Sequence, residues 1–568
     1  MPAAAQSSRE YFVGQIERDV APPQLSTEDA TYYRAIFNAI DREDWEEVEA
    51  LLGERNDGLL HDVARAEYYL HANSPRVELP QIEEWLQTGT RLPMAAQMGR
   101  LGLRRGLQRE PDLPAENSFR SVGDFPRRTR PATIDDGTMP EDVRAAILTA
   151  ISNDDPDGAR LLLDGVDATL SPEARAEWRQ RVAWSYFIEN QDAASLAMAQ
   201  TVSAGSGPWV AEGEWVAGLA AWRLNDCAEA GEAFRRSAFQ AANPELRTAA
   251  LYWASRAALR CRQPQLSSQL LNEAASNDQT LYGMLAAEQL GRRLPSGTGD
   301  SDLSTEDWNR IGDHENVRIA VALAQIDRDD LSSQILLHQA RIGDPADYAA
   351  LSRLARDLGF PQTQLYMAYN APSGGRADPS SYYPTPEWTP ATGWRVDPAL
   401  AYAHILQESN FRDDARSPAN AQGLMQITPI TVREHAGRLN MNASQVDIYD
   451  PATNLAFGQR NLEMLQDNPA THDQLPKIMA AYNAGLTPVT RWNSEIRDFG
   501  DPLLYMEAIP YWETRGYVAI VMRNYWMYER QADAPSPSRL SLAQNEWPRF
   551  PSVSDGDSGR VYLSAERD

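Results

Sequence analysis

Glu408 is the residue of this chain best suited to act as a general acid. It follows an apolar-periodic stretch, residues 399–407, which begins after Asp397-Pro398 and is predicted to be a helix. A carboxyl at the end of an apolar helix is partly removed from water, and desolvation raises its pKa toward neutrality. Taken alone, a solvated glutamate at a helix end is the commoner alternative, so its neighbours must decide.

Five short motifs, each weak by itself, follow one another between residues 408 and 515. They are Glu408-Ser409-Asn410-Phe411, Gly423-Leu424-Met425-Gln426, Asn454–Leu465, Ala481-Tyr482-Asn483-Ala484-Gly485 and Glu513-Thr514-Arg515. Gly423 lies in a polar-to-apolar turn, which suggests a positive φ or a close backbone approach. Gln426 offers amide donors and an acceptor to a sugar. The alternatives are core packing for the second motif and a helix end with a glycine stop for the fourth.

In this order the five motifs resemble the catalytic domain of the soluble lytic transglycosylases. Residues 281–291 are similar to a segment that precedes the linker domain of that family. The resemblance implies an all-α chain with an α-superhelical, solenoid-like N-terminal region of helical hairpins and a C-terminal lysozyme-like domain. We expect the superhelix in residues 1–300, a helical linker domain in 301–376, the catalytic domain in 377–540 and an extended tail in 541–568.

The resemblance also implies the reaction. The substrate is peptidoglycan, cut at the β-1,4 bond between N-acetylmuramic acid and N-acetylglucosamine, with formation of a 1,6-anhydro sugar as the muramyl O6 attacks its own C1. One carboxyl, Glu408, would protonate the leaving oxygen and then accept the O6 proton, assisted by the acetamido group of the substrate. A glycoside hydrolase needs two carboxylates, and the nearby Asp413 and Asp414 are expected to be solvated.

The binding residues of the family carry over position by position. Glycan contacts are expected from Ser409, Met425, Gln426, Tyr482, Asn483 and Glu513. The alternatives are a helix-end serine bonded to a backbone carbonyl for Ser409, core packing for Met425 and a salt bridge to an arginine for Glu513. Aromatic side chains that could stack on sugars are Trp492, Tyr511 and Trp512.

Two rival functions share this pattern. A hydrolytic muramidase on the same fold would add water and give a reducing sugar. A non-catalytic helical-repeat scaffold would bind glycan through a degenerate domain. The presence of Glu408, Ser409, Gln426, Tyr482 and Asn483 argues against degeneration.

The chain upstream is predicted to be almost wholly helical. Segments with apolar residues at i, i+3, i+4 and i+7 fill residues 26–290, separated by short polar breaks. Residues 218–223 resemble residues 255–260, 37 positions later, a period typical of stacked helical hairpins. Residues 105–140 are rich in Pro, Arg and Asp and are expected to form a long connection.

The chain has two cysteines, Cys227 and Cys261, each after the first helix of such a hairpin. Corresponding loops of adjacent repeats are neighbours, so a disulfide is geometrically possible. It would close a loop of about 35 residues and stabilise the fold by about 3–4 kcal/mol. The alternative is two free thiols in a reducing compartment, and export of the protein would favour the disulfide.

The composition limits the classes of partner and cofactor that the protein is expected to bind. The net charge of −27 argues against binding to nucleic acid, and no apolar run is long enough to cross a bilayer. No metal or nucleotide motif occurs, so no cofactor is expected. The first residues lack the features of a signal peptide, so the protein is either cytosolic or has lost one. The resemblance implies a periplasmic location, peptidoglycan strands as the partner, and cell-wall synthesis enzymes as further candidates.

Overall fold

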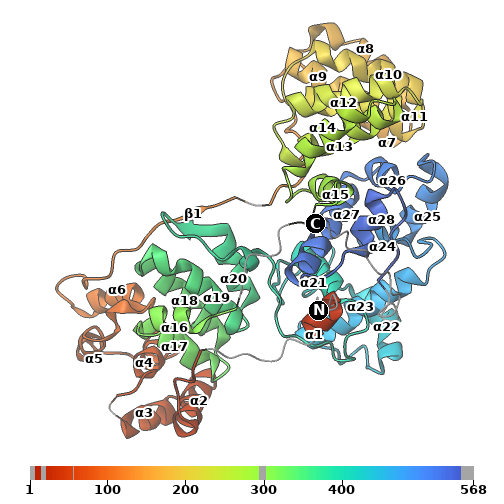
Figure 1. Cartoon of the computed structure of the whole chain (residues 1–568). Coiled ribbons are helices and arrows are strands. Elements are labelled where there is room, and N and C mark those ends of the chain that lie inside the picture. The colour runs from red at the N-terminus through yellow and green to blue at the C-terminus, as the bar shows by residue number, and fades with distance from the viewer. Residues whose placement is uncertain are drawn as a thin grey trace, which may run out of the picture.

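The fold is built almost entirely from helices (Figure 1). The computed structural model describes residues 7–13, 21–55, 57–123, 125–292, 294 and 302–551. Within these residues the strands are β1 (Phe119–Ser121) and β2 (Asn370–Pro372), an antiparallel pair with Phe119 opposite Pro372. The predicted all-α class is confirmed. No helix of the described chain is both long and apolar enough to cross a membrane.

The first helices share a hydrophobic core with the helices after residue 302. The members of this first unit are α2 (Thr27–Asp41), α3 (Trp45–Glu54), α4 (His61–Leu70), α5 (Leu79–Trp85), α6 (Ala95–Arg105), α16 (Thr305–Ile311), α17 (Glu315–Ala324), α18 (Asp329–Ile342), α19 (Tyr348–Asp357) and α20 (Pro361–Tyr369). The sequence predicts that one superhelix ends at residue 300. Instead, the apolar faces of α2–α6 are buried against the predicted linker helices, so one hydrophobic core contains residues from both sides of that boundary.

The second unit is a stack of helical hairpins. It comprises α7 (Glu141–Ser152), α8 (Pro156–Asp164), α9 (Pro172–Ile188), α10 (Asp192–Gln200), α11 (Trp209–Arg223), α12 (Cys227–Gln240), α13 (Pro244–Arg260), α14 (Pro264–Ala275) and α15 (Leu281–Gln289). The hairpin turns repeat one backbone geometry, with positive φ at Asn190, Asn225 and Arg262. The two similar segments end α11 and α13, the equivalent positions that the 37-residue period predicts.

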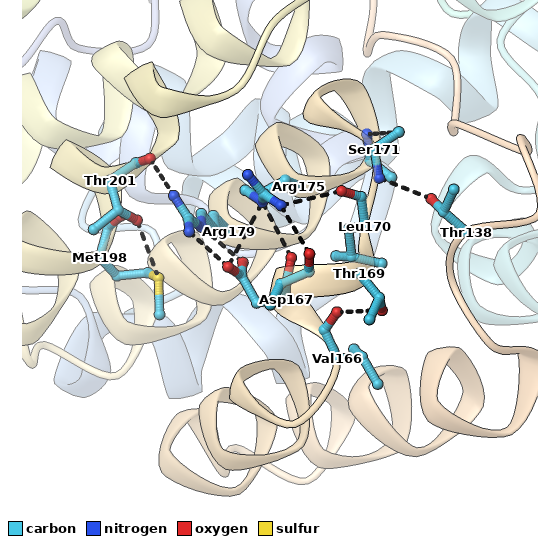
Figure 2. Close-up of polar contacts among 12 residues, drawn as sticks. Thr138, Val166, Asp167, Thr169, Leu170, Ser171, Arg175, Arg179, Met198 and Thr201 are labelled. Carbon is cyan, nitrogen blue, oxygen red and sulfur yellow. Dashed lines mark hydrogen bonds and ion pairs between the residues drawn. The ribbon is translucent and has the colours of Figure 1, made fainter.

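Arginines fasten the turns of this stack (Figure 2). Arg179 donates from Nε and Nη2 to the two carboxylate oxygens of Asp167 at 2.8 and 2.7 Å, and from Nη1 to the carbonyl of Thr201 at 2.6 Å. Arg175 donates to the carbonyl of Leu170 at 3.1 Å. A two-pronged arginine–carboxylate pair fixes orientation as well as distance. The short helix η2 (Asp167–Thr169) is thereby held to α9 and to η3 (Thr201–Ala204).

The C-terminal domain surrounds Glu408. Its elements are η5 (Pro379–Tyr382), α21 (Pro398–Glu408), α22 (Pro429–His435), η6 (Ala436–Leu439), α23 (Pro451–Gln466), α24 (Leu475–Ala484), α25 (Leu486–Glu495), α26 (Pro502–Ala508), α27 (Trp512–Gln531) and α28 (Pro537–Ala543). The N-terminal helix α1 (Ser8–Val13) packs on α21, and Ser8 donates to Asp397 at 2.5 Å. The domain shares one core with the second unit, where α15 packs on α27 and α28.

The start of the predicted tail is part of this domain. Arg549 pairs with Gln474 in an isolated β-bridge, and Phe550 is buried. Residues 541–543 complete α28, and Arg549 and Phe550 pack on the domain, so this part of the predicted tail is attached to it. Residues 552–568 of the predicted tail lie outside the described residues.

The predicted long connection carries part of the contact between the second unit and the C-terminal domain. Arg128 forms ion pairs with Glu212 at 2.8 Å and with Glu507 at 3.1 Å, and so joins α11 to α26. The amide N–H of Ile134 donates to Glu177 at 2.6 Å. The connection thus lies between two packed bodies and holds them together.

Cys227 and Cys261 form a disulfide, as the repeat geometry allows. Cys227 begins α12 and Cys261 caps α13, with their Cα atoms 5.6 Å apart. The bond joins the turns of two successive hairpins. It is therefore a covalent link along the stack of the second unit.

Replacing both cysteines by serine should lower the free energy of unfolding by about 2–4 kcal/mol, because the unfolded chain regains the freedom of the closed loop. Chemical denaturation with and without a thiol reductant measures this effect. The double-serine variant should be insensitive to reductant. Equal stability of the oxidised wild type and the variant would contradict the prediction.

Candidate active site

Glu408 is the last residue of α21, and the helix is built to place it there. Asp397 caps the helix by accepting from the N–H of Ala399 at 2.9 Å, and every residue from Pro398 to Leu406 is buried. Burial raises the pKa of Glu408 to about 7; the nearby charge of Glu513 adds to the rise, and a hydrogen bond from Tyr517 opposes it. At neutral pH the carboxyl can thus both give and take a proton.

Two tyrosines from different helices stand beside this carboxyl. The hydroxyl of Tyr517, on α27, donates to Oε1 of Glu408 at 2.7 Å. The hydroxyl of Tyr482, on α24, donates to the carbonyl of Met425 at 2.8 Å. Burial, with the charge of Glu408, raises the pKa of both tyrosines well above its ordinary value, so both remain neutral donors.

A tight loop, residues 421–428, forms the next part of the site. Gly423 has φ +72°, and a Cβ there would lie 2.1 Å from Nδ2 of Asn454. The predicted positive φ and close approach are both confirmed. Asn454, fully buried on α23, accepts from the N–H of Met425 at 2.8 Å and donates to the carbonyls of Gln422 and Ile448 at 3.0 and 2.7 Å. One side chain therefore holds the loop at two points, Gln422 and Met425, and ties it to the segment before α23 through Ile448.

The predicted binding residues differ in what they present. Tyr482 and Asn483 are half-buried at the end of α24, and Asn483 accepts from the hydroxyl of Thr514 at 2.6 Å. The predicted glycine stop follows, with Gly485 at φ +86°. Glu513 is exposed, and no ion pair links it to Arg515 or Arg523 in the described chain. These side chains stay candidates for glycan contact.

Three of the predicted binding residues interact mainly with other parts of the protein: Ser409, Met425 and Gln426. The hydroxyl of Ser409 donates to the carbonyl of Ile405 at 3.2 Å and its side chain is buried, which is the helix-end alternative. Met425 is fully buried and a Cβ on Gly458 would touch its sulfur, which is the core alternative. Gln426 uses its amide nitrogen on the carbonyls of Ala415 and Gly423, while its residue is half-buried.

Of the three proposed stacking aromatics, one is excluded by burial. Trp492 is 0% exposed and meets the ring of Tyr511 edge-on at 5.1 Å between centroids, so it belongs to the core. Tyr511 is 46% exposed and can still meet a sugar. Trp512 is half-buried under the guanidinium groups of Arg128, Arg130 and Arg515.

Sequence reasoning missed the roles of Tyr517 and Asn454. Tyr517 lies four residues after Glu513, on the same face of a helix. That spacing is a signal that could have singled it out. Asn454 begins the third motif, but nothing in the sequence indicated its bonds, because two of them depend on a loop about 30 residues earlier in the chain.

Replacing Tyr517 by phenylalanine should raise the pKa of Glu408 further, because the variant loses the hydrogen bond that favours the carboxylate. The alkaline limb of the pH–activity profile should move to higher pH. The matched control is Tyr525→Phe on the same helix, whose hydroxyl bonds Asp397 instead. A limb that moves equally in both variants, or in neither, would argue against the assignment.

Gly423→Ala should destabilise the protein by on the order of 2–4 kcal/mol, since the residue would combine an unfavourable φ with a clash against Asn454. Gly437→Ala is the control, because a Cβ there meets nothing within 4 Å. Thermal unfolding of both variants measures the difference. Wild-type stability for Gly423→Ala would contradict the account of the loop.

Comparison with known proteins finds matches to the C-terminal domain. Residues 389–503 match the family described as Transglycosylase SLT domain. A putative soluble lytic murein transglycosylase of Haemophilus influenzae is 34% identical over 150 residues, 26% of this chain and 24% of that protein. The soluble lytic murein transglycosylase of Escherichia coli K12 is 31% identical over 160 residues, 28% and 24% of the two chains. The aligned region thus spans about a quarter of these relatives' length.

Solved structures extend the likeness to the whole fold. The 70-kDa soluble lytic transglycosylase of Escherichia coli has a TM-score of 0.55 at 15% identity, covering 92% of this chain and 99% of its own. An inactive mutant of the lytic transglycosylase Slt of Pseudomonas aeruginosa has a TM-score of 0.52 at 19% identity, covering 90% and 88%. The predicted α-superhelical region with a C-terminal lysozyme-like domain is confirmed. Residues 389–503 thus match the Transglycosylase SLT domain family, and the first four of the five ordered motifs lie within them.

Proposed function

We propose that this chain is a peptidoglycan lytic transglycosylase, which cleaves the β-1,4 bond between N-acetylmuramic acid and N-acetylglucosamine. The observation that carries the proposal is the state of Glu408, a carboxyl at the end of a buried helix with a pKa near 7 and a fixed hydrogen bond from Tyr517. The family match and the names of the relatives support the same substrate.

In the proposed reaction Glu408 acts first as acid and then as base. It protonates the glycosidic oxygen, and the bond from that oxygen to C1 of the muramyl residue breaks. The acetamido group of the substrate stabilises the electron-poor C1. The resulting carboxylate, which accepts the Tyr517 hydroxyl, takes the proton of the muramyl O6 as O6 bonds to C1. Attack from within the same sugar benefits from high effective molarity.

The carboxylates near Glu408 fit a single-carboxyl mechanism. Asp413 accepts from Gln362 at 3.4 Å, and Asp414 is exposed. Glu513 is exposed at the start of α27 and acts on Glu408 through its charge. A hydrolase would need one of these groups to activate a water. Gln426, Tyr482, Asn483 and Glu513 are the proposed glycan contacts.

The disulfide and the family support a periplasmic location. A structural disulfide persists in an oxidising compartment, and peptidoglycan lies outside the cytoplasm. Peptidoglycan strands are the proposed partner. Cell-wall synthesis enzymes are a further class of partner that rests on the family resemblance.

Glu408→Gln should abolish turnover of purified sacculi, with a loss of at least about 10³-fold, because an amide cannot donate and accept the proton. Ionising the buried carboxyl destabilises the folded wild type. This destabilisation increases as the pH rises from the ordinary pKa of a glutamate to about 7, and it is complete above that pH. The amide removes that destabilisation. The variant should therefore be more stable at pH 8, by about 1–3 kcal/mol.

Mass spectrometry of the products separates the proposal from its rivals. The wild type should release muropeptides lighter by one water than the reducing form, and Asp413→Asn, Asp414→Asn and Glu513→Gln should still do so. Reducing products would indicate a hydrolytic muramidase. Full activity of Glu408→Gln would refute the assignment of the acid, and binding without cleavage by the wild type would indicate a scaffold.

A further inference from the structure

His404 is a buried titratable residue within reach of the proposed acid. It lies one helical turn before Glu408 on α21, and its side chain is 0% exposed. The residues around it on the helix, from 399 to 406, are otherwise apolar apart from Tyr402. Burying a polar imidazole at such a position costs free energy, whereas an aliphatic side chain would fill the same space without that cost.

The hydrogen bonds of His404 define its protonation state. Nδ1 lies 2.8 Å from the carbonyl oxygen of Leu400, and a carbonyl only accepts, so Nδ1 carries the proton. Nε2 of the neutral ring is then an acceptor. It is buried and has no hydrogen-bond partner in the described chain. A buried acceptor without a partner costs about 1–3 kcal/mol, and its position calls for an explanation.

The neighbours of His404 are the two tyrosines of the site. Its ring centroid lies 4.9 Å from that of Tyr482 on α24 and 6.2 Å from that of Tyr517 on α27. Tyr517 holds the carboxyl of Glu408, and Tyr482 holds the carbonyl of Met425. A movement of this one imidazole would thus be passed to both the acid and the loop beside it.

We propose that His404 is a positioning residue whose neutral ring keeps the Tyr482 and Tyr517 hydroxyls on their acceptors, and whose protonation in acid disrupts the site. The inference rests on the proposed function, because it assigns to His404 the arrangement of the acid that cleaves the glycan.

The charges facing His404 explain why protonation would disrupt the site. The titratable groups around it are Tyr482 and Tyr517, both neutral, and Glu408 beyond the Tyr517 hydroxyl. An imidazolium would carry a second N–H, on Nε2, that needs an acceptor. That donor would either draw a tyrosine hydroxyl oxygen away from its present position or stay buried without a partner. Burial lowers the pKa of His404 to about 4, which keeps the ring neutral at neutral pH.

His404→Leu tests the proposal with a side chain that fills the space and does not titrate. For the wild type we expect kcat to fall in acid near pH 4 and in alkali near pH 7. In the variant the acid limb should disappear and kcat at pH 6 should drop by about 10- to 100-fold, because both tyrosine hydroxyls shift. KM should change much less than kcat, because Gln426, Asn483 and Glu513 can still contact the glycan.

His435→Leu is the matched control. His435 is also buried and also has an unpartnered Nε2, yet it lies on α22 and no tyrosine ring packs against it in the described chain. It should keep both limbs of the profile and the wild-type kcat. If His404→Leu behaves like His435→Leu, the proposal is overturned.

A second variant and a spectroscopic measurement cover the remaining outcomes. If His404→Leu does not fold, His404→Asn, which keeps an N–H for the Leu400 carbonyl, should fold and lack the acid limb; an acid limb like that of the wild type would overturn the proposal.

Histidine NMR of the wild-type protein should show His404 in the Nδ1-protonated form from pH 5 to 8. Titration near 6.5 would also overturn it. If the wild type itself makes no anhydro product, the proposed function fails, and the NMR result still decides the state of His404.

Discussion

The structure depends on keeping one carboxyl poorly solvated and correctly aimed. Glu408 ends a helix that is buried from Pro398 to Leu406, and a tyrosine from another helix donates a hydrogen bond to one of its oxygens. Burial favours the protonated form and the hydrogen bond favours the carboxylate, so the pKa settles near neutrality. A group that must give a proton and then recover one needs this balance, and neither influence alone would supply it.

The surroundings of Glu408 carry a thermodynamic cost. Ionising Glu408 is unfavourable in the folded protein, and His404 leaves a buried acceptor without a partner. Gly423 holds a conformation that side chains resist, with its space taken by Asn454. Such features concentrate where a fold is shaped for chemistry. The apolar core shared by α15, α27 and α28 offsets them, because it anchors the helix that carries Tyr517.

The second unit, the stack of helical hairpins from α7 to α15, is joined to the C-terminal domain by more than apolar contact. Two largely buried ion pairs join them directly, Arg256 with Asp501 and Glu245 with Arg523, and a third joins Arg128 of the connection to Glu507. Removing one partner of such a pair leaves an uncompensated charge, so these pairs fix one docking geometry. The helix α27 therefore contacts both the second unit and the proposed acid, Glu408, and so connects the two.

The sequence by itself determined the local features of this protein. Apolar periodicity defined the helices, the 37-residue period located equivalent hairpins and the cysteines that join them, and Gly423 and Gly485 marked backbone turns that only glycine adopts easily. These features follow from interactions between residues close in the chain. The order of five motifs was enough to indicate the domain around Glu408.

Only the tertiary structure decided which residues meet. Helices α2–α6 share a core with helices at least 200 residues later, and Trp492 is buried. The hydroxyl of Ser409 bonds a carbonyl of its own helix, while Tyr517 bonds Glu408. The ring of His404 packs against both tyrosines. Each outcome depends on how apolar faces distant in sequence are buried together. Hydrophobic contact is non-directional, so the sequence pattern shows which faces must be covered and leaves open which partner covers them.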